Sequence, residues 1–264
     1  MNIPFYQVDA FTAKPFRGNP AAVCIVDDTV TAELMQQIAA ENNLSETAFV
    51  TPENGQFNLR WFTPVVEVPL CGHATLATAH TLFREGLASA ADTITFNTAS
   101  GILTARQQDG WIELNFPALR GEPVQLPEEI LDILQVSPVQ TIFVDNRYLV
   151  ELATEAEVLG LKPDFSRLAK YPKVIVTAKA RNTSEFDFIS RFFAPVIGIN
   201  EDPVTGAAHC CLAPYWAQKL GKNSMLAYQA SARGGVLKIK LEGDRTILAG
   251  EAVTVIKGTY AINQ

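Results

Sequence analysis

The sequence contains few cysteines, fewer basic than acidic residues, and no long apolar run. Its four cysteines among 264 residues are too few for a disulfide scaffold and fit a reducing compartment. The 21 Lys and Arg residues against 28 Asp and Glu argue against a surface that binds nucleic acid or an anionic membrane. No segment approaches the roughly 18 consecutive apolar residues of a membrane span, and the N-terminus lacks the features of a secretion signal. We therefore expect a cytoplasmic protein without nucleic-acid or membrane partners.

An internal repeat indicates two related halves. The segment Arg60–Val65, RWFTPV, returns as Arg191–Val196, RFFAPV, 131 positions later. Weaker similarities occur in the same order in both halves. They link Phe5–Asp9 with Ile142–Asp145 and Gly101–Ala105 with Gly235–Ile239. A repeat whose period is about half the chain predicts two similarly folded units.

The boundary between these halves is predicted in the turn-rich segment 115–126, where proline, glycine and acidic residues cluster. We expect an N-terminal half over residues 1–116 and a C-terminal half over residues 117–251. The last strand, near residues 252–264, has a pattern that is compatible with a return to the first half but does not fix its place.

Hydrophobic periodicity predicts a mixture of short strands and helices in each half. The strands are expected at residues 21–26, 58–62, 93–96, 111–114, 173–177 and 235–241, and the helices at residues 31–41, 73–85 and 206–220. Each half would then wrap its strands around one apolar helix.

The repeat also predicts a pair of helix starts. The 131-residue offset places Asp202 opposite Cys71, each directly before a predicted helix that begins with small residues. The segments Cys71–Thr75 and Asp202–Gly206 would present backbone N–H groups at the positive end of a helix dipole. Such helix starts can bind a carboxylate or stabilise an enolate oxygen. The alternative for the second segment is an ordinary N-cap, with Asp202 as the cap and proline at the first helical position.

The position of His73 favours a functional role, since it lies at the transition from loop to helix instead of on an apolar face. His80, one of the other two histidines, lies on the apolar face and is interpreted as a core or interface residue. A metal site made of Cys71, His73, His209 and Cys210 is conceivable, but the spacing argues against it. Structural zinc sites usually use separated ligand pairs, whereas adjacent helical cysteines point about 100° apart. We expect no metal.

Glu46 is predicted to lie in an otherwise apolar strand, which follows a helix that ends near Asn42 and Asn43. Burial would raise the pKa of this carboxyl group, which suits it to take a proton in one step and return it in the next. The alternative is a glutamate on an edge strand that faces water. Asn19, within Arg17–Pro20, is interpreted first as a turn residue, with substrate binding as the second possibility.

Taken together, five motifs resemble the phenazine-biosynthesis (PhzF-like) isomerase family nearly from end to end. They are Val8–Thr12, Phe16–Ala21, Leu44–Phe49, Cys71–Thr75 and Glu201–His209. The family is similar to diaminopimelate epimerase, which implies an α+β fold with two pseudo-symmetric halves. Each half is a β-barrel-like sheet around a central helix, and the resemblance implies an active site in the cleft between the halves.

The resemblance also implies roles for individual residues. In the epimerase, two cysteines act as acid and base without a cofactor, whereas here Cys71 is retained and Asp202 holds the second place. In the phenazine isomerase, a glutamate matching Glu46 moves a proton between two carbons of a cyclohexadiene carboxylic acid, with residues matching His73 and Asp202 close by. The expected substrate-binding residues are Asn19, Ser45, Cys71, Gly72, Thr205, Gly206 and Ala207. Among these, the two glycines would present backbone N–H groups, and the serine would orient Glu46.

We therefore predict a cofactor-independent isomerase that shifts a proton within a small unsaturated or carbonyl-activated carboxylic acid, with Glu46 as the general acid and base. One alternative is an amino-acid or hydroxy-acid racemase that uses Cys71 and Asp202. Another is a non-catalytic binding protein of the same fold, because fold similarity does not by itself transmit function. A homodimer through an exposed sheet edge is also expected from the resemblance.

Overall fold

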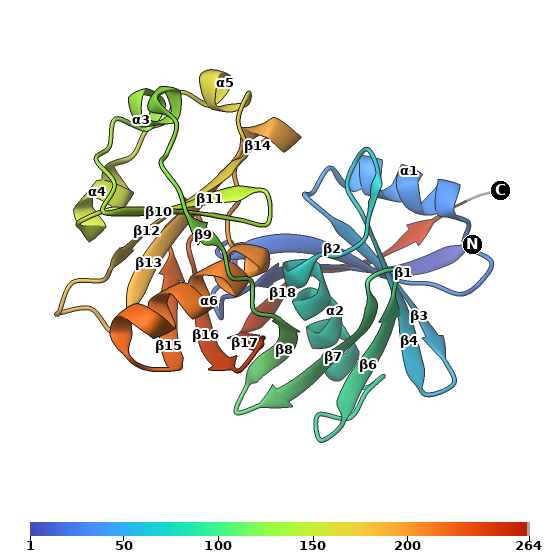
Figure 1. The fold of residues 1–264 in the computed structure, drawn as a ribbon. Helices are drawn as coiled ribbons and strands as arrows, with labels where there is room; N and C mark the ends of the chain where they lie inside the picture. The colour runs from blue at the N-terminus through green and yellow to red at the C-terminus, as the bar shows by residue number, and fades with distance from the viewer. Residues whose placement is uncertain (263–264) are drawn as a thin grey trace. The chain divides into compact units, whose positions relative to one another are not determined.

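The computed structural model describes residues 1–262, and these form two units of similar topology (Figure 1). Unit 1 comprises Met1–Asn115 together with the C-terminal segment that begins at Ala249, and unit 2 comprises Phe116–Leu248. Within the described residues, no helix is both long and apolar enough to cross a membrane.

Unit 1 is a mixed sheet in which most neighbouring strands are antiparallel. Its strands are β1 (Asn2–Ala10), β2 (Asn19–Ile25), β3 (Thr47–Glu53), β4 (Gln56–Phe62), β5 (Glu67–Val68), β6 (Thr93–Thr98), β7 (Gly101–Gln108), β8 (Trp111–Pro117) and β18 (Ala252–Ala261). The pairing runs β18–β1–β2–β3–β4–β6–β7–β8, with β2–β3 and β4–β6 parallel and β5 attached to β4. The final strand thus pairs with β1, and the last two residues of the predicted segment lie outside the described residues.

The centre of unit 1 is α2 (Gly72–Arg84), which the strands surround (Figure 1). Nearly all of its residues up to Leu82 are buried, including threonines on several faces. Those hydroxyls are satisfied inside the helix, because Thr75, Thr78 and Thr81 donate to the backbone oxygens four residues earlier at 2.6–2.9 Å. An apolar helix that is buried on all sides is a core helix.

The second helix of unit 1, α1 (Ala32–Asn42), packs against β3 and β4. Thr31 caps its start by accepting a hydrogen bond from the Leu34 amide, and Asn43 ends it in the left-handed conformation. Its buried residues join a cluster with Phe49 and Phe62, whose rings meet edge to face. These caps explain why the predicted helix ends where the Glu46 segment begins.

Unit 2 repeats the strand arrangement of unit 1. Its strands are β9 (Glu122–Pro123), β10 (Gln140–Val144), β11 (Arg147–Glu151), β12 (Lys173–Lys179), β13 (Phe188–Ala194), β14 (Ile199–Glu201), β15 (Ser224–Gln229), β16 (Gly235–Glu242) and β17 (Arg245–Gly250). The pairing β10–β11–β12–β13–β15–β16 has parallel neighbours at β11–β12 and β13–β15. This is the order and polarity of β1–β2–β3–β4–β6–β7, so the sequence repeat corresponds to a structural one.

The helices of unit 2 differ more in length. They are α3 (Glu128–Leu134), α4 (Glu155–Gly160), α5 (Phe165–Leu168), the short 3₁₀ helix η1 (Pro195–Ile197) and α6 (Gly206–Leu220). The range of α6 matches the predicted helix, and its residues are largely buried. Trp216 stacks on Phe188 at 5.5 Å and donates to the Thr177 hydroxyl at 3.0 Å. Thus α6 is the core helix of unit 2, as α2 is of unit 1.

The residues that the two copies of the repeat have in common form the same local structure in each unit. Arg60 makes a two-pronged ion pair with Glu67 at 2.7 and 2.8 Å, and Arg191 makes the corresponding pair with Glu201 at 2.7 and 2.9 Å. Each guanidinium also lies over the second aromatic ring of its own repeat, at 5.1 and 4.9 Å from the ring centre. The motif therefore stabilises the β4–β5 and β13–β14 hairpins.

The predicted alignment of Cys71 with Asp202 is wrong. The N-cap of α2 is Cys71, but the N-cap of α6 is Thr205, and Asp202 lies three residues earlier, directly after β14. The reason is a longer hairpin in unit 2: Phe62 pairs with Glu67, whereas Phe193 pairs with Glu201 across a bulge and η1. The alternative interpretation of Asp202 as the N-cap of the helix is wrong for the same reason.

Candidate functional site

Glu46 lies at the junction between α1 and β3, one residue before the strand instead of inside it as predicted. Its backbone oxygen accepts a hydrogen bond from the Ala22 amide at 3.3 Å, at the end of the parallel β2–β3 pairing. The side chain is 17% exposed, which does not fit a glutamate that faces water on an edge strand. The carboxyl group is therefore held at a partly desolvated position.

His73 brings Glu46 and Cys71 together in unit 1. Its Nε2 atom lies 3.4 Å from Oε2 of Glu46, and its Nδ1 atom lies 3.5 Å from Sγ of Cys71. The start of α2 produces this geometry, because Cys71 is the N-cap and His73 is in the first turn. A thiol, an imidazole and a carboxylate thus form one cluster, which we call the unit 1 cluster.

Burial determines the charge of His73. The imidazole is buried, and this lowers its pKa to about 4, against a smaller opposing effect of a hydrogen bond with the Pro20 backbone. The ring is therefore neutral near pH 7. A neutral imidazole can donate through one nitrogen and accept through the other, so it can connect its two neighbours without carrying charge.

The loop before Asn19 fixes that residue at the start of β2. Asp9 is buried, and its Oδ2 accepts a hydrogen bond from the Phe16 amide at 2.7 Å. Gly18 has a φ of +63°, and a Cβ atom there would lie 2.1 Å from the Ala10 oxygen, so glycine is required. Asn19 then begins β2 with its side chain wholly buried.

Ser45 and Gly72 are the remaining predicted residues of unit 1. Ser45 is partly buried next to Glu46, and its orienting role stays a prediction. Gly72 is the first residue of α2, and the Cys71 side chain does not cap that helix. The first-turn N–H groups are therefore oriented for an acceptor outside the helix, such as a substrate oxygen.

Unit 2 holds a second group of predicted residues. The Asp202 amide donates to the Phe192 oxygen at 3.0 Å, and the Thr205 hydroxyl donates to Oδ2 of Asp202. Gly206 and Ala207 are the first residues of α6, whose first turn is not capped by the Thr205 side chain. The expected meeting of Asp202 with Glu46 and His73, which belong to different units, stays a prediction.

Gln229 is a residue that sequence reasoning missed. Its side-chain amide donates to the Asp202 oxygen at 2.8 Å and to the Thr205 hydroxyl at 3.2 Å, and accepts from the Thr205 amide at 2.8 Å. The residue is completely buried at the end of β15. The sequence signal for Gln229 is a polar residue at an inward position of a strand whose residues alternate between buried and more exposed. Such a residue needs hydrogen-bond partners inside the protein.

His209 and Cys210 behave as packing residues of α6. Nδ1 of His209 lies 2.8 Å from the Thr205 oxygen, and burial lowers the pKa of the ring to about 4. Burial also raises the pKa of the Cys210 thiol well above its usual range. Neither group has the environment of a thiolate or a charged imidazole at neutral pH.

Potential metal ligands gather in the unit 1 cluster. Over residues 1–262, the grouping of such atoms is that of Glu46, Cys71 and His73, whose ligand atoms lie within 4.8 Å of one another. The thiol and the carboxylate, however, approach different ring nitrogens. Of the two contacts, the one between Cys71 and Nδ1 has hydrogen-bond geometry, whereas Nε2 makes no hydrogen bond within the described residues.

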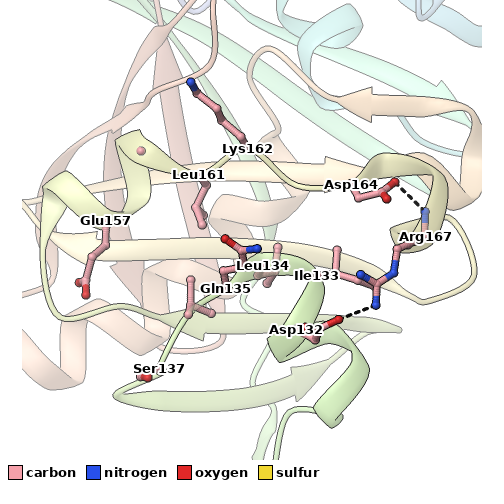
Figure 2. A pocket seen from close by; sticks show the side chains of 12 residues that line it. Asp132, Ile133, Leu134, Gln135, Ser137, Glu157, Leu161, Lys162, Asp164 and Arg167 are labelled. Carbon is pink, nitrogen blue, oxygen red and sulfur yellow. Dashed lines mark hydrogen bonds and ion pairs between the residues drawn. The ribbon is translucent and has the colours of Figure 1, made fainter.

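A separate hollow in unit 2, of about 740 Å³, is bordered by α3, α4 and α5 (Figure 2). Two of its charged side chains form an ion pair, Arg167 with Asp132 at 2.6 Å, and Asp164 accepts a hydrogen bond from the Arg167 backbone amide at 3.1 Å. The Asp132 and Arg167 side chains are at least half exposed, as in an ordinary surface ion pair. None of the predicted site residues lines this hollow.

These features define an α+β protein of the diaminopimelate epimerase-like fold with an acid–base cluster at the start of a core helix. Residues 8–258 match the PhzC-PhzF family, described as phenazine biosynthesis-like protein, and the chain belongs to this family. The predicted family is thereby confirmed.

Individual relatives agree with this assignment. An uncharacterised isomerase of Halalkalibacterium halodurans is 52% identical, covering 97% of this chain and 98% of that protein. A crystal structure of a PhzF-family protein from Enterococcus faecalis is 40% identical, with a TM-score of 0.94 over 99% of this chain and 100% of that one. The chain is thus an enzyme of the isomerase type.

More distant structures share the fold alone. A probable proline racemase from Agrobacterium radiobacter superposes with a TM-score of 0.61 at 12% identity, covering 99% of this chain and 93% of that one. The predicted fold class is confirmed by this likeness and by the two repeated sheets.

Proposed function

We propose that the chain is a cofactor-independent isomerase that shifts a proton within a small unsaturated or carbonyl-activated carboxylic acid. Glu46 is assigned as the general base that removes the proton and the general acid that returns it. The observation that carries this assignment is the 3.4 Å approach of its Oε2 atom to the buried, neutral His73.

In this proposal Glu46 removes a proton from a carbon beside the activating group. Positioned acid–base catalysis of this kind contributes roughly 10²–10⁴-fold. Negative charge then develops on a substrate oxygen, which the N–H groups at the start of α2 would stabilise by several kcal/mol more. The same carboxyl group then delivers the proton to another carbon on the same face of the substrate.

Asp202 and the residues at the start of α6 are assigned to substrate binding and proton transfer in the same reaction. Support comes from the hydrogen bonds that fix the Asp202 segment through Thr205 and Gln229, because a functional carboxylate needs a defined position. Thr205, Gly206 and Ala207 would contribute hydrogen bonds to the substrate carboxylate.

Two further properties belong to the proposal. All four cysteines are buried free thiols, which supports a reducing compartment such as the cytoplasm.

A homodimer through a sheet edge is proposed as well, and light scattering on the purified protein measures it directly. A monomer at micromolar concentration would contradict the proposed homodimer but not the proposed reaction.

The experiment is hydrogen exchange in heavy water, followed by NMR, on a panel of unsaturated, keto, amino and hydroxy carboxylic acids. Glu46→Gln keeps the shape of the side chain but removes the exchangeable proton, so exchange and isomerisation should fall at least 100-fold. Glu41→Gln, the same change on the exposed face of α1, is the matched control and should keep full activity.

Several results would contradict the assignment. Full turnover by the Glu46→Gln variant would eliminate Glu46 as the base. Exchange confined to the α-carbon of an amino or hydroxy acid, with loss of optical activity, would favour the racemase. Absence of exchange over the whole panel, with co-elution of a purified partner, would favour the non-catalytic alternative.

A further inference from the structure

Two basic side chains lie next to each other on the inner face of the unit 2 sheet. Arg147 begins β11 and Lys173 begins β12, and these residues are direct partners in the parallel pairing of the two strands. The residues that follow them, Tyr148 and Val174, join the hydrophobic cluster of α3, α4 and α5. Because successive side chains of a strand point to opposite faces, Arg147 and Lys173 are on the face towards α6. We call these two residues the basic pair.

Contacts with α6 show how far along that helix the basic pair lies. Further along the two strands, Glu151 accepts a hydrogen bond from the Tyr215 hydroxyl at 2.7 Å, and Thr177 accepts one from the Trp216 indole at 3.0 Å. The basic pair lies four residues earlier on each strand, a distance of about 13 Å that equals about nine residues of helix. The arginine of the pair opposes the rise in the pKa of the Cys210 thiol, which precedes Tyr215 in α6. The basic pair is therefore level with the first two turns of α6.

Lys173 occupies the position in unit 2 that Glu46 occupies in unit 1. Phe49 of β3 and Val176 of β12 each pair with the arginine of their own repeat. Three residues before these two lie Glu46 and Lys173. In unit 1 this position brings the side chain to His73, in the first turn of α2. The corresponding place beside the first turn of α6 thus carries a positive charge.

The basic pair has more positive charge than its surroundings compensate. Arg147 is buried and forms an ion pair with Asp145. Lys173 is partly buried, and within residues 1–262 its ammonium group forms no ion pair or hydrogen bond. Helix α6 contains no acidic residue between Gly206 and Leu220. A partly buried cation without an acidic partner is unfavourable for the folded protein unless an anion binds to it.

We propose that Lys173 binds the carboxylate group of the substrate at the start of α6, in the positive potential of Arg147. This inference rests on the proposed function and names the charged group that would hold the substrate beside the N–H groups of Gly206 and Ala207. An ammonium group donates a charge-assisted hydrogen bond to a carboxylate, which is stronger than a bond from a neutral donor. Arg147 is held by Asp145 and acts on the anion through its charge.

The first test uses the protein without substrate. Burial and the neighbouring Arg147 lower the pKa of Lys173, so its charged form is disfavoured in the folded protein. Lys173→Met keeps the approximate length of the side chain and removes the charge, and should raise the Tm by about 2 °C or more. Lys179→Met, at the exposed end of the same strand, is the control and should change the Tm less. A Tm of Lys173→Met that is not above that of the control would overturn the proposal.

The second test measures the binding of crotonate, a small unsaturated carboxylate, and of its uncharged amide, crotonamide. Nitrogen-15 NMR at constant ionic strength follows the backbone amide signals of Gly206 and Ala207. Crotonate should shift these signals to saturation, whereas crotonamide should not. Lys173→Met should weaken crotonate binding by about tenfold or more, and Lys173→Arg, which keeps the charge, should weaken it less. Absence of a saturable shift, equal binding of the amide, or unchanged affinity in Lys173→Met would overturn the proposal.

The third test uses a substrate found in the exchange panel. Lys173→Met should raise the KM by about tenfold or more and leave kcat nearly unchanged, because the contact with the carboxylate is the same before and during proton transfer. An unchanged KM, or a fall in kcat alone, would overturn the assignment of Lys173 to substrate binding.

The two proposals fail separately. If crotonate binds through Lys173 but no carboxylic acid of the panel exchanges protons, the carboxylate site stands and the proposed function fails. If exchange depends on Glu46 but neither crotonate affinity nor KM depends on Lys173, the proposed function stands and the carboxylate site fails.

Discussion

At the scale of single residues, burial decides the chemistry of the histidines. His73, His80 and His209 all have pKa values lowered to about 4, with desolvation as the main cause. The three histidines thus share one protonation state, in which each ring is neutral at pH 7. Their folded-state pKa values lie below the value of about 6.5 expected in the unfolded chain.

This shift predicts that the protein loses stability as the pH falls from about 6.5 towards 4. The unfolded chain binds more protons than the folded chain in this window, so the free energy of unfolding decreases with decreasing pH. A buried histidine such as His209 should contribute a loss of about 2 kcal/mol between pH 7 and pH 5. Urea denaturation at the two pH values measures the effect.

The control for this prediction is His209→Gln, which keeps a hydrogen-bond donor near the Thr205 oxygen but does not titrate. The variant should lose less stability than the wild-type protein over the same pH interval. Equal losses in the two proteins, or no loss in either, would contradict the assignment of a buried neutral ring.

The sequence allowed the immediate neighbourhood of His73 to be predicted only in part. A histidine at a loop-to-helix transition indicated a functional group, and a glutamate after a capped helix indicated a second one. Their 3.4 Å separation depends on the pairing of β2 with β3 and on the packing of α2, which connect residues far apart in the chain. Gln229 was missed because no strand was predicted over residues 224–229, so its inward position in β15 was not recognised.

At the scale of elements, β15 holds the segment that precedes α6. Gln229, at the end of β15, makes three hydrogen bonds to Asp202 and Thr205 and is completely buried. Gln229→Met keeps the approximate size of the side chain but leaves the backbone partners unsatisfied. Its free energy of unfolding should fall by about 1–3 kcal/mol.

The Gln229→Met variant should also lower the turnover of any substrate that depends on Asp202, since the segment would no longer be fixed. Gln108→Met, the same change at an exposed strand end in unit 1, is the control for both measurements. Thermal denaturation and the exchange assay provide the two readouts. Stability equal to that of the control would contradict the role of Gln229.

The elements also explain which part of the repeat could be aligned by sequence. The Arg-aromatic-Phe-x-Pro-Val motif gave the right correspondence for β4 and β13, because its arginine forms the same ion pair in both hairpins. Beyond the hairpin, corresponding residues of the two units are no longer separated by 131 positions, since the turn in unit 2 contains η1 and a bulge. A constant offset therefore misplaced Asp202 relative to the helix start.

At the scale of the whole molecule, the return of the last strand joins distant parts of the chain. β18 pairs with β1 from Ala10 to Asn2, so that Asn2 lies opposite Ala261. Tyr260 adds an edge-to-face contact with Phe5 and a hydrogen bond to Asn42. The sequence pattern identified the strand but not its partner, because pairing at this separation is set by the topology of unit 1.

Removal of β18 should therefore destabilise unit 1. A chain that ends at Glu251 exposes the edge of β1, and its free energy of unfolding should fall by several kcal/mol, a large share of the roughly 5–15 kcal/mol of a typical domain. A chain that ends at Ile262 is the control. Urea denaturation, with NMR signals of both units, distinguishes local from global loss, and unchanged stability would contradict the prediction.

The pairing of β18 with β1 also has a consequence for synthesis on the ribosome. Domains generally fold in the order in which they are made, yet here the strand that borders β1 is translated after the whole of unit 2. The later unit can therefore acquire its fold first, while the earlier one exposes an unpaired strand edge to the crowded cell. Chaperone dependence of the nascent chain should consequently reside in its first hundred residues.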